Sequence, residues 1–315
     1  MSETMKAVIC HGPRDYRLEE VPKPVPGPGE ALVRVEAVGI CASDLKCYHG
    51  AAKFWGDENR PAWAETEVIP GHEFVGEVVS IDAAGSKRWG IQVGDRVVSE
   101  QIVPCWECRY CKRGQYHMCQ PHNLYGFKRV TPGAMAEFMV YPVEALVHKV
   151  SKDLPAAHAA FAEPLSCSLH AVERAGITFD DVVVVAGCGP IGLGMVAGAR
   201  AKSPAHVIAL DMAPEKLELA KLCGLTSSST SPTRTPCRSS RISPTGTGPM
   251  SISKGQAIRP QFPRASTSCV SSAPTSNTGC SKTTSASTGA SSATTRNLMS
   301  SGRTWGPTAG LPQSG

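Results

Sequence analysis

The sequence predicts an α/β protein with two folded parts: a twisted β-barrel of short strands, then a partial doubly wound domain with a parallel sheet. Three observations support this. Short apolar runs rich in β-branched residues recur over residues 1–150, an alanine- and leucine-rich stretch follows, and a fully apolar segment then leads into a glycine-rich turn. The expected domains are residues 1–155 and 156–225, and a low-complexity tail expected to be disordered covers 226–315.

The barrel rests on segments in which apolar residues alternate or cluster as they do in strands. These segments are residues 5–10, 30–40, 73–81, 95–99 and 137–141. Stretches rich in proline and glycine, such as 22–30, read as turns between them. Because loops on a rigid scaffold often carry functional groups, we expect a site among the long connections.

The second part alternates helices with buried strands, an order that predicts a parallel sheet. Residues 155–175 read as helix, and 181–186 (DVVVVA) are a short apolar run typical of a buried parallel strand. A helix then extends to Lys202, a second apolar strand covers 206–210, and a third helix covers 211–224.

A GxGxxG motif joins the first of these strands to its helix, so it has the strand–turn–helix context of a dinucleotide-binding turn. Gly187, Gly189, Pro190, Ile191 and Gly192 would let the backbone approach a pyrophosphate at the helix N-terminus. Asp211 ends the second strand, where a carboxylate binds the ribose hydroxyls and repels a 2′-phosphate. We therefore expect a partial Rossmann domain that binds NAD in preference to NADP.

Four cysteines lie close together in the first part: Cys105, Cys108, Cys111 and Cys119, spaced C-x2-C-x2-C-x7-C. Four thiolates on so short a loop can surround one Zn²⁺ at little entropic cost. The spacing predicts a structural zinc site. A pair of disulfides and an iron–sulfur cluster are the alternatives.

A second set of metal-binding residue types comes from two separate segments. Cys41 follows a strand in GICASD at 39–44, and His72 and Glu73 open another strand in GHE at 71–73. Cysteine, histidine and carboxylate can bind a catalytic zinc and leave one position open. Alone, Cys41 reads as a small buried hydrophobe and His72 as a hydrogen-bonded loop imidazole. Together with the cysteine lobe and the glycine motif, they favour a catalytic zinc site.

Composition separates the tail from the rest of the chain. Residues 226–315 contain no Asp or Glu, nine Lys or Arg and 38 Ser or Thr. The remaining chain holds all 27 acidic residues and 23 of the 32 basic ones, so the overall charge of +5 does not indicate a nucleic-acid partner. No apolar stretch is as long as a membrane span and no signal peptide is evident, so we expect a cytoplasmic protein with reduced cysteines and no membrane partner.

Two interpretations of residues 226–315 stay open, a natural disordered tail and out-of-frame translation. A G+C-rich gene read out of frame yields serine, threonine, proline and arginine without acids. Residues 249–255, read one frame away, can also encode a strand-like Asp-Val-Tyr-Ile-Glu-Gly. We therefore hypothesise a one-nucleotide frameshift near Leu225.

The chain resembles the zinc-dependent medium-chain dehydrogenases, and among them the sorbitol dehydrogenase-like polyol dehydrogenases. The resemblance covers residues 5 to about 224 and rests on six segments in the family's order: GICASD at 39–44, GHEFVGEV at 71–78, GDRV at 94–97, the lobe at 105–119, AEPLSC at 162–167 and GCGPIG at 187–192. GICASDLKCYHG and the loop FWGDENRPAWAETEVIPGHE are similar to enzymes acting on erythritol or threitol.

This resemblance implies a GroES-like catalytic barrel, a Rossmann domain, catalytic and structural zinc, and hydride transfer from a secondary alcohol of a polyol to NAD. It implies that Cys41, His72 and either Glu73 or Glu163 bind the catalytic zinc; the glutamate at 163, where the alcohol branch has cysteine, favours the polyol branch. It also implies that the intact protein is a homo-oligomer. Since the rest of the nucleotide domain would follow Leu225, we expect this chain to be impaired.

The resemblance also assigns roles around the catalytic zinc. Asp44 would hold His72 and fix its tautomer, and Ser43 would take the proton of the substrate hydroxyl. One departure is Lys46, which stands where related polyol enzymes carry a relay histidine, with His49 three residues further on. The final proton acceptor therefore stays open.

Two other functions compete with a zinc dehydrogenase. A non-catalytic zinc-binding interaction module would use the barrel without a catalytic metal, yet Cys41, His72 and Glu73 are all present. A zinc-free quinone reductase would lack the cysteine lobe. The number of zinc ions per chain distinguishes these three functions.

Overall fold

A computed structural model describes residues 3–230, 250–253 and 256–258. The first part is built on a five-stranded antiparallel sheet in the order β8-β3-β4-β5-β9. Its strands are β3 (Ala31–Gly39), β4 (Glu73–Ile81), β5 (Arg96–Ser99), β8 (Phe138–Tyr141) and β9 (Val147–Lys149). Alternate residues are buried along β5 and β8, as expected for strands with one face on a core.

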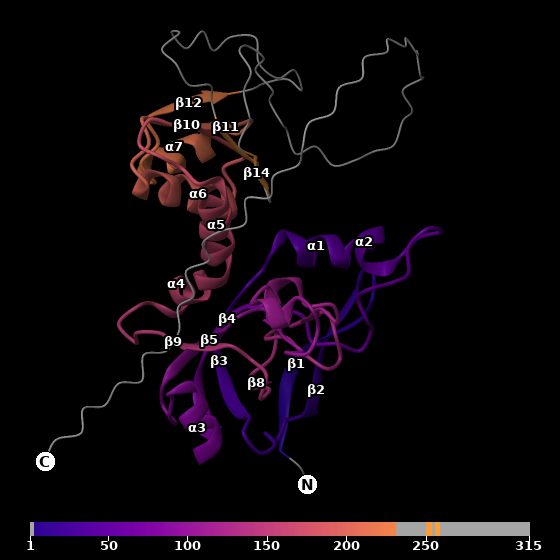
Figure 1. The fold of residues 1–315 in the computed structure, drawn as a ribbon. Coiled ribbons are helices and arrows are strands. Elements are labelled where there is room, and N and C mark those ends of the chain that lie inside the picture. The colour runs from indigo at the N-terminus through magenta and orange to yellow at the C-terminus, as the bar shows by residue number, and fades with distance from the viewer. Residues whose placement is uncertain (1–2, 231–249, 254–255, 259–315) are drawn as a thin grey trace, which may run out of the picture. The chain divides into compact units, whose positions relative to one another are not determined.

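Two smaller sheets accompany this one. The hairpin of β1 (Thr4–Gly12) and β2 (Asp15–Pro22), both labelled in Figure 1, is antiparallel, and so is the pair β6 (Ile102–Val103) and β7 (Asn123–Leu124). The barrel expected from the sequence does not close through the strand pairings of the described residues, in which β8 and β9 stay at opposite edges of the sheet.

Short helices join the strands of the first part. They are α1 (Ala42–Tyr48), α2 (Ala52–Trp55), α3 (Ala83–Trp89) and the 3-10 turns η1 (Cys111–Arg113) and η2 (Tyr116–Met118). Two residues separate β3 from α1, and Asp82 caps α3, where its side chain accepts a hydrogen bond from the backbone N–H of Gly85. The strands predicted for this part all form, with ends shifted by up to two residues. Strands β2, β6, β7 and β9 and the helices of this part were not predicted.

The second part contains a parallel sheet in the order β12-β11-β10-β13, with β14 added antiparallel at one edge. The elements are α4 (Ala156–Ala160), α5 (Ala162–Ala175), β10 (Val182–Ala186), α6 (Pro190–Ala201), β11 (His206–Asp211) and α7 (Pro214–Leu222). Helices α6 and α7 lie beside β10 and β11 in Figure 1, and α5 packs against α6. Helix α4 instead packs against β3 and β4 of the first part. The predicted helix over 155–175 is therefore two helices that meet at Phe161.

The core of this second part forms between the strands and their covering helices. Val183 and Val185 of β10 are fully buried against Val196 of α6 and Val207 of β11. Every residue of β10 is apolar because a parallel strand that helices cover on both sides has no solvent-facing side. This packing fixes where β10 ends and therefore where the glycine turn begins.

The sheet continues past residue 225, where the sequence placed the domain boundary. Strands β12 (Ser227–Thr230), β13 (Met250–Ser253) and β14 (Gln256–Ile258) all belong to it, although they lie in the segment expected to be a tail. Backbone hydrogen bonds build these strands, β12 on β11, β13 on β10 and β14 on β13, and such bonds need no apolar pattern. The predicted low-complexity residues 231–249, 254–255 and 259–315 lie outside the described residues.

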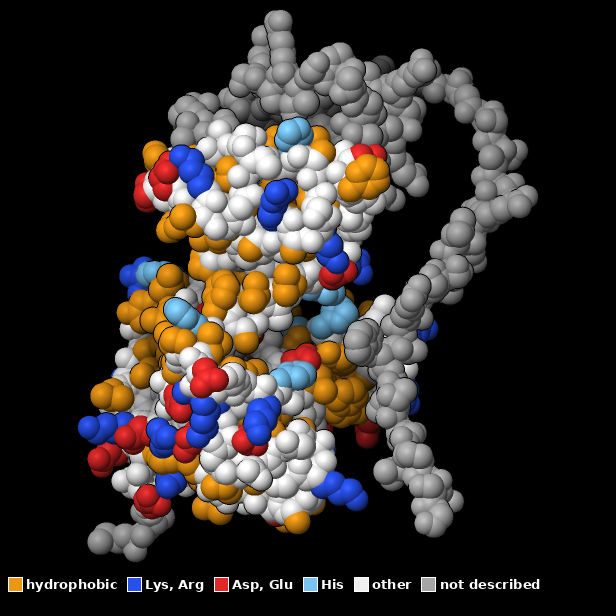
Figure 2. Space-filling model, turned by 90° about the vertical axis from the view of Figure 1, so that its left-hand side faces the viewer, with side chains coloured by type: hydrophobic (Ala, Val, Ile, Leu, Met, Phe, Trp, Pro, Cys, Tyr) orange, Lys and Arg blue, Asp and Glu red, His pale blue; other side chains and the backbone are white. Residues whose placement is uncertain are grey.

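Two surface properties bear on the class of protein. Figure 2 shows acidic and basic side chains interspersed on the face that it presents. Within the described ranges, no helix combines the length and the apolar character that a bilayer crossing needs.

Candidate zinc and dinucleotide sites

The register of two strands brings the predicted catalytic zinc ligands together. Gly39 at the end of β3 pairs with Glu73 at the start of β4. Cys41, two residues past β3, therefore lies beside His72 and Glu73, and one ligand atom from each residue lies within 4.8 Å of the other two. A side chain at position 39 would collide with the Glu73 carboxylate, so glycine there makes room for this arrangement.

The surroundings of His72 orient its ring. Nδ1 lies 3.3 Å from Oδ1 of Asp44, and Nε2 lies 3.3 Å from Oγ of Ser43. The other Asp44 oxygen accepts a hydrogen bond of 2.8 Å from the backbone N–H of Cys41. The single carboxylate of Asp44 thus contacts two of the three candidate ligands.

The electrostatics of this site favour positive charge. Burial lowers the pKa of His72, but interaction with the Asp44 carboxylate and the Cys41 sulfur outweighs it and raises the pKa to about 10. Sulfur, imidazole nitrogen and carboxylate oxygen are the donors that a catalytic zinc takes from proteins, with a fourth position left open. The donor set of Cys41, His72 and Glu73 therefore fits a bound zinc ion.

Glu163, the alternative ligand, lies near these residues but outside the group whose ligand atoms converge. It sits in the first turn of α5, where its Oε1 accepts a 3.4 Å hydrogen bond from Sγ of Cys167. Burial raises the pKa of Glu163, and the charge of His72 opposes this rise. In this arrangement, Glu73 is the carboxylate beside Cys41 and His72, and Glu163 is a nearby acid.

A cavity of about 510 Å³ opens beside Ser43 and His72. The sequence did not predict most of its walls, which come from three segments far apart in the chain. The other lining residues are Lys53, Phe54, Trp63, Gln101, Gln120, Pro121, His122, Leu124 and Phe127. The aromatic residues in the loop before His72 were the one feature of the sequence that could have indicated an aromatic cavity wall. Lys46 and His49, the open relay positions, are exposed and are not among the residues that line this cavity.

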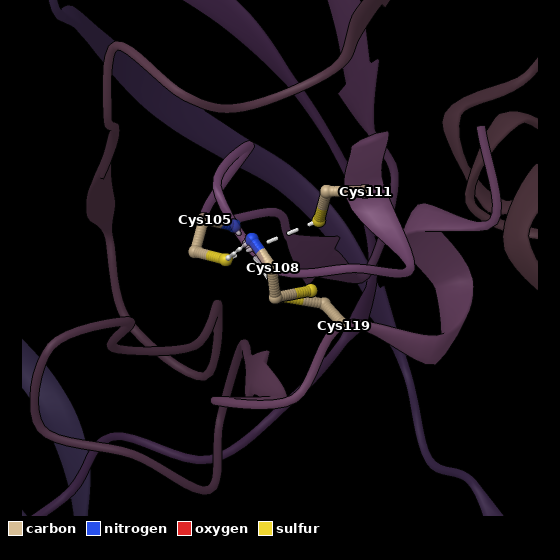
Figure 3. Close-up of side chains that lie close together, drawn as sticks. All are labelled: Cys105, Cys108, Cys111 and Cys119. Carbon is tan, nitrogen blue, oxygen red and sulfur yellow. Dashed lines mark hydrogen bonds between the residues drawn. The ribbon is translucent and has the colours of Figure 1, made fainter. Parts of the chain in front are cut away.

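The four lobe cysteines converge as predicted, with the sulfur atoms turned toward one another (Figure 3). One ligand atom from each lies within 4.8 Å of the others, and Sγ of Cys105 and Sγ of Cys111 are 4.0 Å apart. The backbone N–H of Cys105 donates to Sγ of Cys119, and the backbone N–H of Cys108 donates to Sγ of Cys105, each at 3.3 Å. Such N–H···S bonds fix the thiolates for a tetrahedral metal.

Backbone donors and burial act in opposite directions on these thiols. Hydrogen bonds from the backbone N–H groups of Cys111 and Gln120 lower the pKa of Cys108 to about 6, whereas burial raises the pKa of Cys111 to about 12. Four thiolates so close together need a cation between them. The lobe therefore fits one structural zinc ion.

The glycine turn has the shape of a dinucleotide cradle. Gly187 has φ +93°, in the left-handed region that favours glycine, and no described atom lies within 4 Å of a Cβ placed on Gly187 or Gly189. At Gly192, by contrast, a Cβ would lie 1.7 Å from the carbonyl oxygen of Gly187. Helix α6 starts directly after the turn, with Pro190 in its first turn, so its free N–H groups face the open side.

Asp211, the predicted ribose ligand, ends β11 next to this turn. Its Oδ2 accepts a 2.6 Å hydrogen bond from the backbone N–H of Cys188, and its Oδ1 accepts one of 2.9 Å from that of Ala213. Burial raises the pKa of Asp211, but these backbone donors outweigh it and hold the pKa below the usual 3.8. Asp211 is therefore ionised and fixed beside the cradle, and each oxygen keeps a lone pair for a ligand.

Comparison with known proteins gives the same picture. Residues 27–152 match the alcohol dehydrogenase GroES-like domain. The erythritol/L-threitol dehydrogenase of Mycolicibacterium smegmatis is 82% identical over 222 residues, which are 70% of this chain and 61% of that protein. Sorbitol dehydrogenase of Bombyx mori is 34% identical over 220 residues, 70% of this chain and 60% of that protein.

A solved structure extends the comparison to a bound cofactor. Acetophenone reductase from Geotrichum candidum in complex with NAD superposes with a TM-score of 0.64 at 28% identity, covering 75% of this chain and 66% of that one. The chain spans about three fifths of the length of the curated relatives it matches.

Over the matched residues, the fold agrees with that of the medium-chain dehydrogenases, with a GroES-like domain at residues 27–152 followed by a nucleotide-binding part. Among the alcohol and polyol dehydrogenases, the chain is similar to erythritol/L-threitol dehydrogenase and, at lower identity, to sorbitol dehydrogenase.

Proposed function

We propose that this chain carries the site of a zinc-dependent dehydrogenase that transfers a hydride from a secondary alcohol of a short polyol to NAD. The convergence of Cys41, His72 and Glu73 beside a cavity is the observation that carries the proposal. The 82% identity to erythritol/L-threitol dehydrogenase supports a four-carbon polyol as substrate.

The chain's own residues have separate tasks in this reaction. Zinc bound by Cys41, His72 and a glutamate, Glu73 or Glu163, would lower the pKa of the substrate hydroxyl, and NAD would accept the hydride. Ser43 lines the cavity next to His72, where its hydroxyl takes the substrate proton and passes it outward.

NAD is the proposed cofactor because the glycine turn at 187–192 lies next to the ionised carboxylate of Asp211. The N-terminus of α6 and the open space at Gly187 and Gly189 suit a pyrophosphate. The Asp211 carboxylate beside them would accept hydrogen bonds from the ribose hydroxyls and repel the 2′-phosphate of NADP.

We further propose that the chain as printed is impaired by a one-nucleotide frameshift near Leu225. The acid-free composition of residues 226–315 supports this. Hydride transfer requires the nicotinamide within about 3–3.5 Å of the reacting carbon, and the family builds that subsite from the second half of the nucleotide domain. An uninterrupted reading frame in independent isolates would contradict the frameshift.

Metal content and turnover test the function directly. We expect two zinc ions per chain; a single ion would favour a non-catalytic zinc-binding module, and none a zinc-free quinone reductase. Protein from a gene with the frame restored at Leu225 should reduce NAD with erythritol or threitol, followed by NADH absorbance. If the frame-restored protein oxidises none of erythritol, threitol, xylitol and sorbitol, the proposed substrate class is refuted. If the chain as printed oxidises them at a high rate, the proposed impairment is refuted.

A further inference from the structure

A row of tilted ring contacts leads along the cavity from the candidate zinc ligand. The centre of the His72 ring lies 5.3 Å from that of Phe127, Phe127 lies 5.2 Å from Trp63, and Trp63 lies 5.6 Å from His122. All four residues line the cavity. Two aromatic rings therefore connect His72 to His122, and His122 offers a polar group at the far end of this row.

Several contacts hold Trp63 in place. Its backbone N–H donates to the carbonyl of Phe54 at 2.8 Å, and the N–H of Glu65 donates to the carbonyl of Phe127 at 3.1 Å. Lys128 Nζ lies 5.4 Å from the centre of the indole ring. The loop before His72 is therefore tied to the segment around Phe127, and the wall is fixed before any substrate binds.

His122 is held by its backbone as well as by Trp63. Its φ of +52° lies in the left-handed region, which a non-glycine residue rarely adopts without support from its surroundings. Cys119, a lobe cysteine, lies three residues before it, so the folded lobe sets the path of the chain into the cavity. A residue kept in this conformation beside a cavity points to a role there.

Two other polar groups on the wall have contacts of their own: Gln101 donates through Nε2 to Sγ of Cys167 at 3.7 Å, and Nζ of Lys53 lies 4.9 Å from the centre of the Phe54 ring. His122 differs from these and from Gln120, which also lines the cavity, because it belongs to the row of ring contacts that starts at His72. An imidazole can donate or accept a hydrogen bond at either nitrogen, which suits a hydroxyl, and the aromatic faces suit the C–H edges of a short carbon chain.

We propose that His122, held against Trp63, binds the hydroxyl of the polyol that is remote from the reacting carbon. This inference rests on the proposed function and goes beyond it, because it names the side chain that selects a polyol over a simple alcohol. A site built to pair with a hydroxyl discriminates strongly against an analogue that lacks it.

Ligand binding to the zinc-loaded full chain tests this without requiring turnover. Dissociation constants are measured by ligand-observed NMR for erythritol and for 2-butanol, which has four carbons but only one hydroxyl. His122→Ala should weaken erythritol binding about tenfold and change 2-butanol binding less than about twofold. His117→Ala, an exposed lobe histidine outside the cavity lining, is the matched control and should change neither.

Two further variants keep the test decisive if His122→Ala loses stability. His122→Asn tolerates the left-handed backbone and keeps a donor and an acceptor, so it should retain part of the preference for erythritol. Trp63→Phe keeps the wall apolar but moves His122, and should weaken erythritol binding selectively. An equal loss for both ligands, or no loss for erythritol, in folded variants overturns the role of His122. Failure of the unaltered chain to bind either ligand overturns the proposed function itself.

Discussion

Oδ1 of Asp44 lies 3.3 Å from Nδ1 of His72, and the two side chains are only 6% and 4% exposed. Because the carboxylate faces Nδ1, the ring presents Nε2 to Ser43 and to the side of Cys41. The second Asp44 oxygen accepts the backbone N–H of Cys41, so the position of one ligand and the orientation of another depend on the same carboxylate.

Asp44→Asn should therefore lower zinc affinity at the Cys41–His72 site by about 10- to 100-fold, as is typical when the partner of a ligating histidine is lost. Zinc held by the lobe should be unaffected. Competition with a chelator, which resolves the two sites by affinity, measures both. Asp153→Asn, at an exposed acid, is the control. Equal zinc affinities in Asp44→Asn and the unaltered chain would show that the contact does not support the metal.

Cys108→Ser should remove the lobe zinc and destabilise the first part, because the binding energy of a structural zinc is folding energy. Zinc per chain should fall from two to one, with a lower melting temperature, while the Cys41 site stays loaded. Cys223→Ser, a half-buried cysteine outside both metal groups, should change neither value. Full zinc content and an unchanged melting temperature in Cys108→Ser would refute the structural role.

The sites that the sequence predicted share one property: each depends on local order along the chain. The lobe cysteines lie within one loop, so their spacing alone predicts that they converge. Cys41 and Glu73 meet because β3 pairs with β4, but each lies at or just beyond the end of a strand that the sequence pattern predicts. No sequence pattern predicts the contact between Trp63 and His122, because tertiary packing brings together the two segments that carry them.

Missed elements have the same physical origin. Strand β2 (Asp15–Pro22) has no buried residue, so it lacks the alternation by which a half-buried strand is recognised. Strand β13 (Met250–Ser253) lies in a serine-rich segment and depends on backbone pairing with β10. Hydrogen bonds to a neighbouring strand leave no trace in the pattern of apolar residues.

Asp211→Ser should let NADP compete with NAD, because it removes the charge that repels a 2′-phosphate. The affinity ratio of the two cofactors, measured by calorimetry on the frame-restored protein, should shift toward NADP by about tenfold or more. Glu215→Ser, which removes an exposed acid from the first turn of α7, controls for general charge loss. An unaltered ratio would mean that Asp211 does not contact the ribose.

Two glycines of the same turn should respond differently to alanine. At Gly192 a Cβ would lie 1.7 Å from the carbonyl oxygen of Gly187, so Gly192→Ala must push α6 away from β10 and should cost about 1–3 kcal/mol or more. At Gly189 no described atom lies within 4 Å of the new Cβ, and φ is −76°, which alanine adopts freely.

Gly189→Ala should consequently leave the melting temperature unchanged and weaken dinucleotide binding, because its methyl group occupies the open side of the turn that a pyrophosphate would approach. Gly192→Ala should lower the melting temperature first, and any loss of binding would follow from the displaced helix. Thermal unfolding and calorimetric NAD titration of the two variants, side by side, separate these effects. Equal losses of stability in both, or undiminished NAD binding in Gly189→Ala, would contradict the cradle derived from this turn.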